Sequence, residues 1–205
     1  LKRRGVDCVG TVSNVNAGIQ WVIDNKATYG IEIFNMSLGI AGCSDGTDST
    51  SLIVNSAVDA GLVGVVAAGN EGPAKCTIGS PAAAAKAITV GAMADVEPGT
   101  ATTGLPAKGF YQAYFSSRGP TADNRIKPDI SAPGVKITAA KAGTTNGYIE
   151  YNGTSMSSPF VAGLAGLMLH ANSTLTPLQV KTKIMEIAKD WGLTGVDIDY
   201  GAGRL

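Results

Sequence analysis

The apolar residues of this chain follow two different spacings, and each spacing predicts a different kind of element. Between residues 14 and 29 they recur at intervals of three and four, which is typical of an amphipathic helix. Gly30 follows at a position where a left-handed residue commonly ends a helix. Residues 31–38 indicate a mostly buried strand. Residues 62–68 are almost continuously apolar, which is typical of a central parallel strand covered on both faces.

The order of these elements predicts an α/β fold. A helix over residues 50–60 is expected between the two strands, and another strand is expected over 87–92. Helices that alternate with strands in this way predict a parallel sheet with crossover helices. Further along, the sequence predicts a surface loop over 95–114, another strand over 135–140, and a last helix that starts near Thr176 with a capping box and a proline.

The composition narrows the class of protein. The chain has 205 residues, 44% of them hydrophobic and 16% charged, with 27 glycines, which suits one well-buried domain with many tight turns. The 16 basic and 16 acidic residues cancel, so nothing indicates a nucleic-acid partner. No apolar run reaches the ~18 residues of a membrane span, and no signal peptide is evident. We therefore expect neither a nucleic acid nor a membrane as partner.

The cysteines and the histidine argue against a metal centre. Cys8, Cys43 and Cys76 show no Cys-x-x-Cys or Cys/His spacing, and His170 is the only histidine. A zinc site or another histidine-based site is therefore not expected. Three cysteines allow one disulfide and one free thiol, and the count alone leaves that question open.

Residues 151–163 combine a tight turn, a serine and the start of a helix. Gly153 allows the turn, and the apolar run after it is typical of a helix buried on every face, with Pro159 in its first turn. Ser155 would lie at the positive end of the helix dipole, where backbone N–H groups can stabilise an oxyanion. A serine in this place also fits a simple helix cap, so the turn alone leaves both interpretations open.

A second polar residue follows the most buried of the predicted strands. Asn70 lies just after residues 62–68, between Gly69 and Gly72. Ligands of a parallel sheet meet the carboxyl ends of its strands, so the amide of Asn70 could donate a hydrogen bond into the same cleft as Ser155. The alternative is an ordinary turn asparagine, which tolerates left-handed backbone.

Two motifs together resemble a known family. Residues 153–163, Gly-Thr-Ser-Met-Ser-Ser-Pro-Phe-Val-Ala-Gly, closely resemble the nucleophile motif of the subtilisin-like serine proteases, or subtilases. Residues 67–72, Ala-Ala-Gly-Asn-Glu-Gly, resemble their oxyanion-hole motif. The resemblance implies a three-layer α/β/α fold with helices on both faces of the sheet. It also implies peptide hydrolysis through an acyl-enzyme on Ser155, with Asn70 and the Ser155 N–H as the oxyanion hole.

A third motif, Asn-Met-Ser-Leu-Gly at residues 35–39, looks like the subtilase strand that pairs with bound peptide. Recognition by strand addition depends on the main chain and tolerates many sequences, and small uncharged walls imply a roomy apolar pocket of broad specificity. Without the motif, an ordinary core strand would explain these residues. The resemblance assigns substrate binding to Ser37, Leu38, Gly39, Ala67, Ala68, Gly69, Gly79 and Asn152.

The resemblance carries further expectations. It implies that the loops with Cys43 and Cys76 lie near each other, so that a Cys43–Cys76 disulfide would brace the pocket walls. Met156 would flank the nucleophile, and its oxidation would disturb the site. A secreted protein is implied as well. Structural calcium is a further implication, but no ligand set can be assigned and solvated loop acids are the preferred interpretation of Asp45, Asp48, Asp197 and Asp199.

The chain departs from the family pattern at the catalytic base. Neither an Asp-Thr-Gly nor a His-Gly-Thr-His type of motif is present, although the family order is Asp, His, Ser. His170 follows Ser155 by 15 residues, which is ~22 Å along a helix at ~1.5 Å per residue. Asp7 has no glycine-flanked strand end around it. We therefore expect the triad Asp and His on an upstream segment of the same domain, and the chain alone to be inactive.

Three interpretations follow. In the first, residues 1–205 are a partial peptidase domain, incomplete on its N-terminal side, of a secreted endopeptidase that cleaves polypeptides. In the second, they form a catalytically inactive subtilase-like module that binds peptides or a partner. In the third, they are an unrelated α/β binding domain. The intact Ser155 and Asn70 favour the first interpretation, the missing histidine favours the second, and the linked motifs argue against the third.

Overall fold

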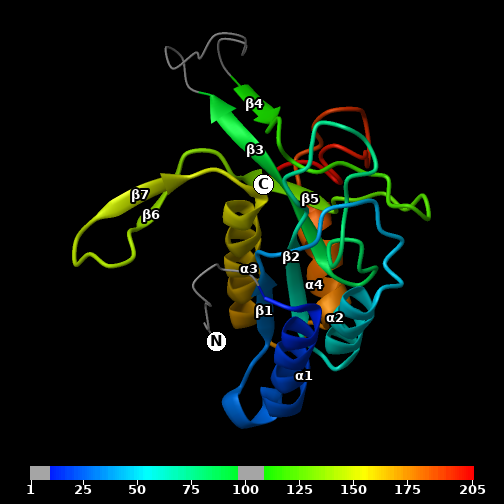
Figure 1. The fold of residues 1–205 in the computed structure, drawn as a ribbon, viewed down its shortest axis with the longest axis vertical. Helices are drawn as coiled ribbons and strands as arrows, with labels where there is room; N and C mark the ends of the chain where they lie inside the picture. Colours follow the sequence, from blue (N-terminus) through cyan, green and yellow to red (C-terminus); the bar gives the residue numbers. More distant parts are fainter. Residues whose placement is uncertain (1–9, 97–108) are drawn as a thin grey trace.

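The computed structural model describes residues 10–96 and 109–205, and its centre is a five-stranded sheet (Figure 1). Strands β1, β2, β3 and β5 run parallel to one another, whereas β4 is antiparallel to the far end of β3. A two-stranded antiparallel ribbon, β6–β7, projects away from this sheet. The strands are β1 Ile33–Met36, β2 Val63–Ala67, β3 Ile88–Val96, β4 Gly109–Gln112, β5 Ile130–Pro133, β6 Ile137–Ala140 and β7 Tyr148–Tyr151.

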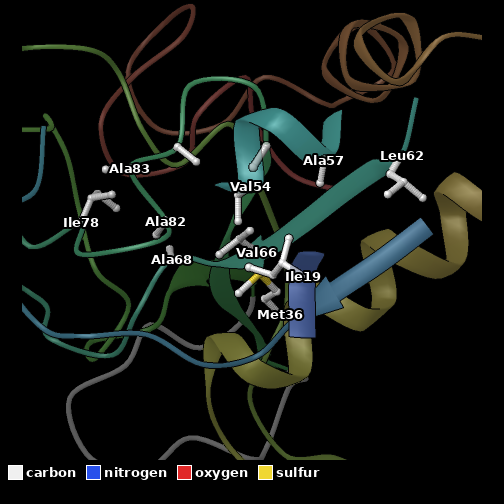
Figure 2. Packing of buried hydrophobic residues seen from close by; sticks show 12 residues of the cluster. Ile19, Met36, Val54, Ala57, Leu62, Val66, Ala68, Ile78, Ala82 and Ala83 are labelled. Atoms are coloured by element: carbon white, nitrogen blue, oxygen red, sulfur yellow. The ribbon is translucent and has the colours of Figure 1, made fainter. Parts of the chain in front are cut away.

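Two hydrophobic clusters, one on each face of the sheet, give the chain three layers. Helices α1 (Val12–Tyr29) and α2 (Ser49–Asp59) pack on one face, and α3 (Thr154–Ala171) and α4 (Pro177–Glu186) pack on the other. Along β2, Val66 belongs to the first cluster, whereas Val65 belongs to the second. Figure 2 shows Val66 beside Met36 and Ile19 in the first cluster. The predicted α/β class with helices on both faces is confirmed.

The segments with clear periodicity form the predicted helices. Helix α1 begins directly after Thr11, whose hydroxyl accepts a hydrogen bond from the N–H of Asn14. The helix ends at Gly30, which has φ 62°. The last helix begins with the predicted capping box, in which Thr176 and Gln179 bond reciprocally. The strand predicted over 62–68 is the central β2, buried along its whole length.

The shorter strands differ from the prediction. The strand expected over 31–38 is only the four-residue β1 at the edge of the sheet, and Met36 is its one buried residue. The ends of the expected loop over 95–114 belong to β3 and β4, and residues 97–108 lie outside the described part. The strand expected over 135–140 is β6 of the ribbon, while the sheet receives β5 instead. β5 is four residues long and ends in a proline, so its signal in the sequence is weak.

The described residues cover helix α3 on one face only, so the predicted burial on every side is wrong. Val161 and Ala165 are buried against the sheet, whereas Phe160 is 53% exposed and Leu167 is 69% exposed. Pro159 is the sixth residue of the helix and so lies in its second turn, not its first. Of the helices described, none is long and apolar enough to cross a membrane, α3 included.

A buried cluster of three charges joins the sheet to α4. Asp129 accepts from the Nζ atoms of Lys127 at 2.6 Å and Lys181 at 2.9 Å, and from the N–H of Thr89 at 2.7 Å. Burial lowers the pKa of Lys127 to about 7, although the negative charge of Asp129 alone would raise it. The positive charge of the nearby Lys181 lowers the pKa further. Burial alone would raise the pKa of Asp129, but the ammonium groups of Lys127 and Lys181 hold it below its usual value.

Candidate active site

A glycine turn places Ser155 at the N-terminus of α3. β7 ends at Tyr151, Gly153 has φ 152°, and the helix begins at Thr154. The N–H of Gly153 donates to the carbonyl oxygen of Gly134 at 2.8 Å, which fixes the turn against the end of β5. Ser155 is therefore the second residue of a helix. At this position backbone N–H groups have no partner within the helix and the dipole is positive.

The side chain of Asn70 is held by the first residue of α3. Its Oδ1 accepts hydrogen bonds from the N–H of Thr154 at 3.0 Å and from the Thr154 hydroxyl at 3.1 Å. That hydroxyl in turn accepts the N–H of Gly69 at 3.2 Å. Because the amide oxygen is occupied, Nδ2 is the group of Asn70 that remains to donate. Thr154 was not singled out from the sequence, although it stands directly before Ser155 in the motif.

A cavity of about 140 Å³ lies between the start of α3 and the loops that follow β1 and β2. Ser155 and Asn70 line it together with most of the expected substrate-binding residues, namely Leu38, Gly39, Ala67, Ala68, Gly69 and Gly79. Glu71 lines it too, so the walls expected to be uncharged include one acidic residue. The cavity is also lined by Thr77, and by five residues that the sequence motifs did not indicate, namely Ile40, Ala41, Ser80, Ala82 and Thr154.

Two of the expected substrate-binding residues do not line this cavity. The hydroxyl of Ser37 donates to the carbonyl oxygen of Ser155 at 2.9 Å, on the side of α3. The side-chain oxygen of Asn152 accepts the N–H of Lys136 at 2.6 Å, where the β6–β7 ribbon begins. Their roles toward substrate stay predictions.

Two loops that form walls of the cavity lie in direct contact. Ile40 and Ser80 form a β-bridge, in which the N–H of Ile40 donates to the oxygen of Ser80 at 2.8 Å. A Cβ added to Gly79 would lie 2.0 Å from the carbonyl oxygen of Ile40. Only glycine therefore allows the loops to approach this closely at that position.

A disulfide joins the same two loops. Cys43 follows the first wall and Cys76 precedes the second, and their Cα atoms lie 5.0 Å apart. The expected Cys43–Cys76 pairing is thereby confirmed. Cys8 lies outside the described residues.

The carboxylates considered for calcium are mostly engaged by protein groups. Asp48 caps α2 and accepts the hydroxyl of Ser80 at 2.5 Å. Burial would raise the pKa of Asp48, but hydroxyl and backbone donors outweigh it and keep the pKa below its usual value. Asp197 is 7% exposed and accepts three backbone N–H groups. The expectation of a solvated acid is therefore wrong for these two, and neither carboxylate fits a calcium site. Across residues 10–96 and 109–205, no three His, Cys, Asp or Glu side chains cluster to hold a metal ion.

The described residues bring no histidine to Ser155. His170 lies on the same helix 15 residues further along, which places it ~22 Å away at ~1.5 Å per residue. It is exposed in the last turn of α3. Asp7 lies outside the described residues. The cavity thus combines a serine at a helix N-terminus with an amide donor, without a histidine from the described part of the chain.

Comparisons with known proteins agree with this geometry. A model of the subtilase family matches residues 2–203. Serine protease AprX of Bacillus subtilis is 36% identical over 96% of this chain, and subtilisin of Bacillus pumilus is 36% identical over 96% as well. The chain spans 47% and 61% of these relatives' own lengths. Among solved structures, sphericase superposes with a TM-score of 0.76 at 29% identity, over 95% of this chain and 63% of its own.

Proposed function

The chain belongs to the subtilase family, and on this basis we propose that it supplies the nucleophile, the oxyanion hole and the substrate strand of a serine endopeptidase. The observation that carries the proposal is the anchoring of Asn70 Oδ1 by Thr154. It leaves the Nδ2 of Asn70 to donate in the cavity that Ser155 also lines. An amide fixed in advance stabilises charge that develops in the transition state without having to reorganise.

In the proposed reaction, Ser155 Oγ attacks the carbonyl carbon of a peptide bond while a base takes its proton. The carbonyl oxygen becomes an oxyanion, which receives hydrogen bonds from Asn70 Nδ2 and the Ser155 N–H. The carbon–nitrogen bond then breaks, and the base returns the proton to the departing amine. Water hydrolyses the resulting ester on Ser155 in the same manner, which releases the acid product and restores the hydroxyl.

Polypeptides are the proposed substrates. Residues 37–39 follow the edge strand β1, and a peptide added there as a further strand would run past Ser155. The alanine and glycine walls of the cavity suit medium-sized apolar side chains, and Glu71 adds a negative charge. We also propose a secreted protein, because the Cys43–Cys76 disulfide suits an oxidising compartment.

The base and its carboxylate partner are proposed to come from another segment of the same protease domain. Among the described strands, β1 has a neighbour on one side only, and the outer face of α3 exposes Phe160 and Leu167. An uncovered strand edge beside an apolar helix face favours packing of a further element. A segment that packs here would also reach the start of α3, where Ser155 lies.

Covalent labelling with a fluorophosphonate tests the proposal. The chain alone should not react at Ser155, because no base is available to take the proton. The full protease, with the segment that carries the base, should label at Ser155 alone, as read by mass spectrometry of the digest. A Ser155→Ala variant provides the blank.

The same experiment separates the runner-up function, an inactive module that binds peptides. In that case the full protein would bind a peptide but leave Ser155 unlabelled at every pH tried. That outcome would overturn the proposed endopeptidase activity.

Met156 offers a separate prediction. Its side chain is half-buried, and its sulfur would lie 3.6 Å from a Cβ added to Gly153 in the nucleophile turn. Oxidation to the sulfoxide introduces a polar oxygen there, and we expect acylation of Ser155 to slow by about tenfold or more. Labelling rates before and after peroxide treatment measure this, and a Met156→Leu variant should keep its rate in peroxide. Equal rates after complete oxidation of Met156 would contradict the prediction.

A further inference from the structure

The carbonyl group of Ser155 has lost its usual helical donor. In an α-helix, each carbonyl oxygen accepts the N–H of the residue four positions later. For Ser155 that residue is Pro159, which lies inside α3 and has no N–H. The backbone of the nucleophile therefore contains an acceptor that the regular helix pattern leaves unsatisfied, and an unsatisfied carbonyl carries a cost in free energy.

The side chain of Ser37 supplies the missing donor. Its Oγ donates to the carbonyl oxygen of Ser155 at 2.9 Å, across 118 positions of sequence. The same Oγ lies 2.9 Å from Ser158 Oγ and accepts the Nδ2 of Asn35 at 3.1 Å. A hydroxyl has one proton and two acceptor sites. When the Ser37 hydroxyl donates its proton to the Ser155 carbonyl oxygen, its oxygen accepts hydrogen bonds from both Asn35 and Ser158. All the hydrogen-bonding sites of the hydroxyl are then used.

This hydrogen bond joins the strand expected to hold the substrate to the residue expected to attack it. Ser37 follows β1 directly, and Ser155 is the second residue of α3. The distance between a bound peptide carbonyl and the attacking hydroxyl depends on how these two elements are held together. Small misplacements of reacting atoms are expensive, since about 1 Å can cost as much as 10²-fold in rate.

We propose that Ser37 acts through its side chain as a positioning residue. By replacing the N–H that Pro159 lacks, it fixes the backbone of Ser155 in register with the substrate strand. This role is distinct from the binding of substrate by the main chain of residues 37–39, and it rests on the proposed function. The hydroxyl of Ser37 does not touch the reacting atoms.

Three variants test the proposal in the full protease: Ser37→Ala, Pro159→Ala and the double variant. Ser37→Ala should lower the maximal rate of fluorophosphonate labelling at Ser155 by about fivefold to tenfold, as for one ordinary hydrogen bond. With a peptide substrate the loss should fall on kcat and leave KM nearly unchanged. Pro159→Ala alone should change little. In the double variant, the new N–H at position 159 should donate to the Ser155 carbonyl and restore most of the rate.

A matched control lies in α2, where the hydroxyl of Ser56 donates to the carbonyl oxygen of Leu52 at 3.1 Å. Ser56→Ala removes the same kind of bond far from the site and should leave labelling unchanged. An unaltered rate in Ser37→Ala would overturn the proposal. So would a slow double variant, because the loss would then have another origin.

A readout that needs no activity keeps the result separate from the proposed function. The ¹³C chemical shift of the Ser155 carbonyl reports its hydrogen bond in the chain alone. It should move in Ser37→Ala and return in the double variant. If the full protease never labels, the proposed function fails, while a carbonyl shift that stays fixed in Ser37→Ala contradicts the inference about Ser37 by itself.

Discussion

Replacing Asn70 with alanine is expected to slow the acylation of Ser155 by about 10²–10³-fold in the full protease. The oxyanion exists only in the transition state and the intermediate, so kcat should fall while KM stays nearly constant. In subtilisin, a relative of this chain, loss of one oxyanion-hole donor costs about 2.7–4 kcal/mol. Steady-state kinetics on a peptide substrate measure both constants.

Asn172 provides the control for this variant. Its Oδ1 accepts the N–H and the hydroxyl of Thr174 at 3.1 Å and 2.7 Å, the same arrangement that Thr154 gives Asn70. It lies beyond the opposite end of α3 from Ser155. Asn172→Ala should leave kcat unchanged. If Asn70→Ala also leaves kcat unchanged, the side chain of Asn70 does not stabilise the oxyanion.

Asp129→Ala is expected to lower the free energy of unfolding by about 3–5 kcal/mol, because it removes the carboxylate partner of the buried Lys127 and the partly buried Lys181. Asp129 is 6% exposed and Lys127 is 2% exposed, so water cannot replace the lost carboxylate. Urea unfolding followed by circular dichroism measures the change. Asp59→Ala, which breaks the exposed pair with Lys86, should cost less than about 1 kcal/mol.

The pH dependence of stability provides a second measurement on the same cluster. The ammonium groups of Lys127 and Lys181 hold the pKa of Asp129 in the folded chain below its usual value, so its stabilising contribution is complete above the ordinary titration range of an aspartate. It is lost as the pH falls through the lower folded pKa. The unfolding free energy of the natural chain should therefore fall more steeply in acid than that of Asp129→Asn. Parallel acid curves for the two proteins would contradict this.

Long elements with a clear period were predictable from the sequence alone. The spacing of apolar residues specified the helix that ends at Gly30, and the continuous apolar run specified β2. Ser155, Asn70 and six of the expected substrate-binding residues line the cavity, and they were predictable because their motifs are contiguous. Lining residues such as Ile40 and Ser80 were not, because they reach the cavity through a contact between two loops. The strand β5 was not predictable, because it has only four residues and ends in a proline, so its signal in the sequence is weak.

Contacts between distant segments were beyond the reach of the sequence. Nothing near Lys127 and Asp129 indicates burial, because their partner Lys181 comes from a helix more than fifty residues later. The exposure of Phe160 could not be predicted from the sequence either, because α3 is apolar also on faces that the described sheet does not cover. The hydrogen bond from Ser37 to Ser155 depends on a pairing that only the folded chain reveals.

The disulfide between the two cavity walls has a consequence for how this protein withstands cleavage by proteases. The chain between Cys43 and Cys76 includes α2 and β2, so the disulfide closes a covalent ring that contains both of these elements. If a protease cuts a single peptide bond within this ring, both new ends stay attached to one molecule. The walls around Ser155 remain held together after such a nick. In a mixture of proteases that digest one another, damage at one bond in this region therefore does not divide the molecule in two.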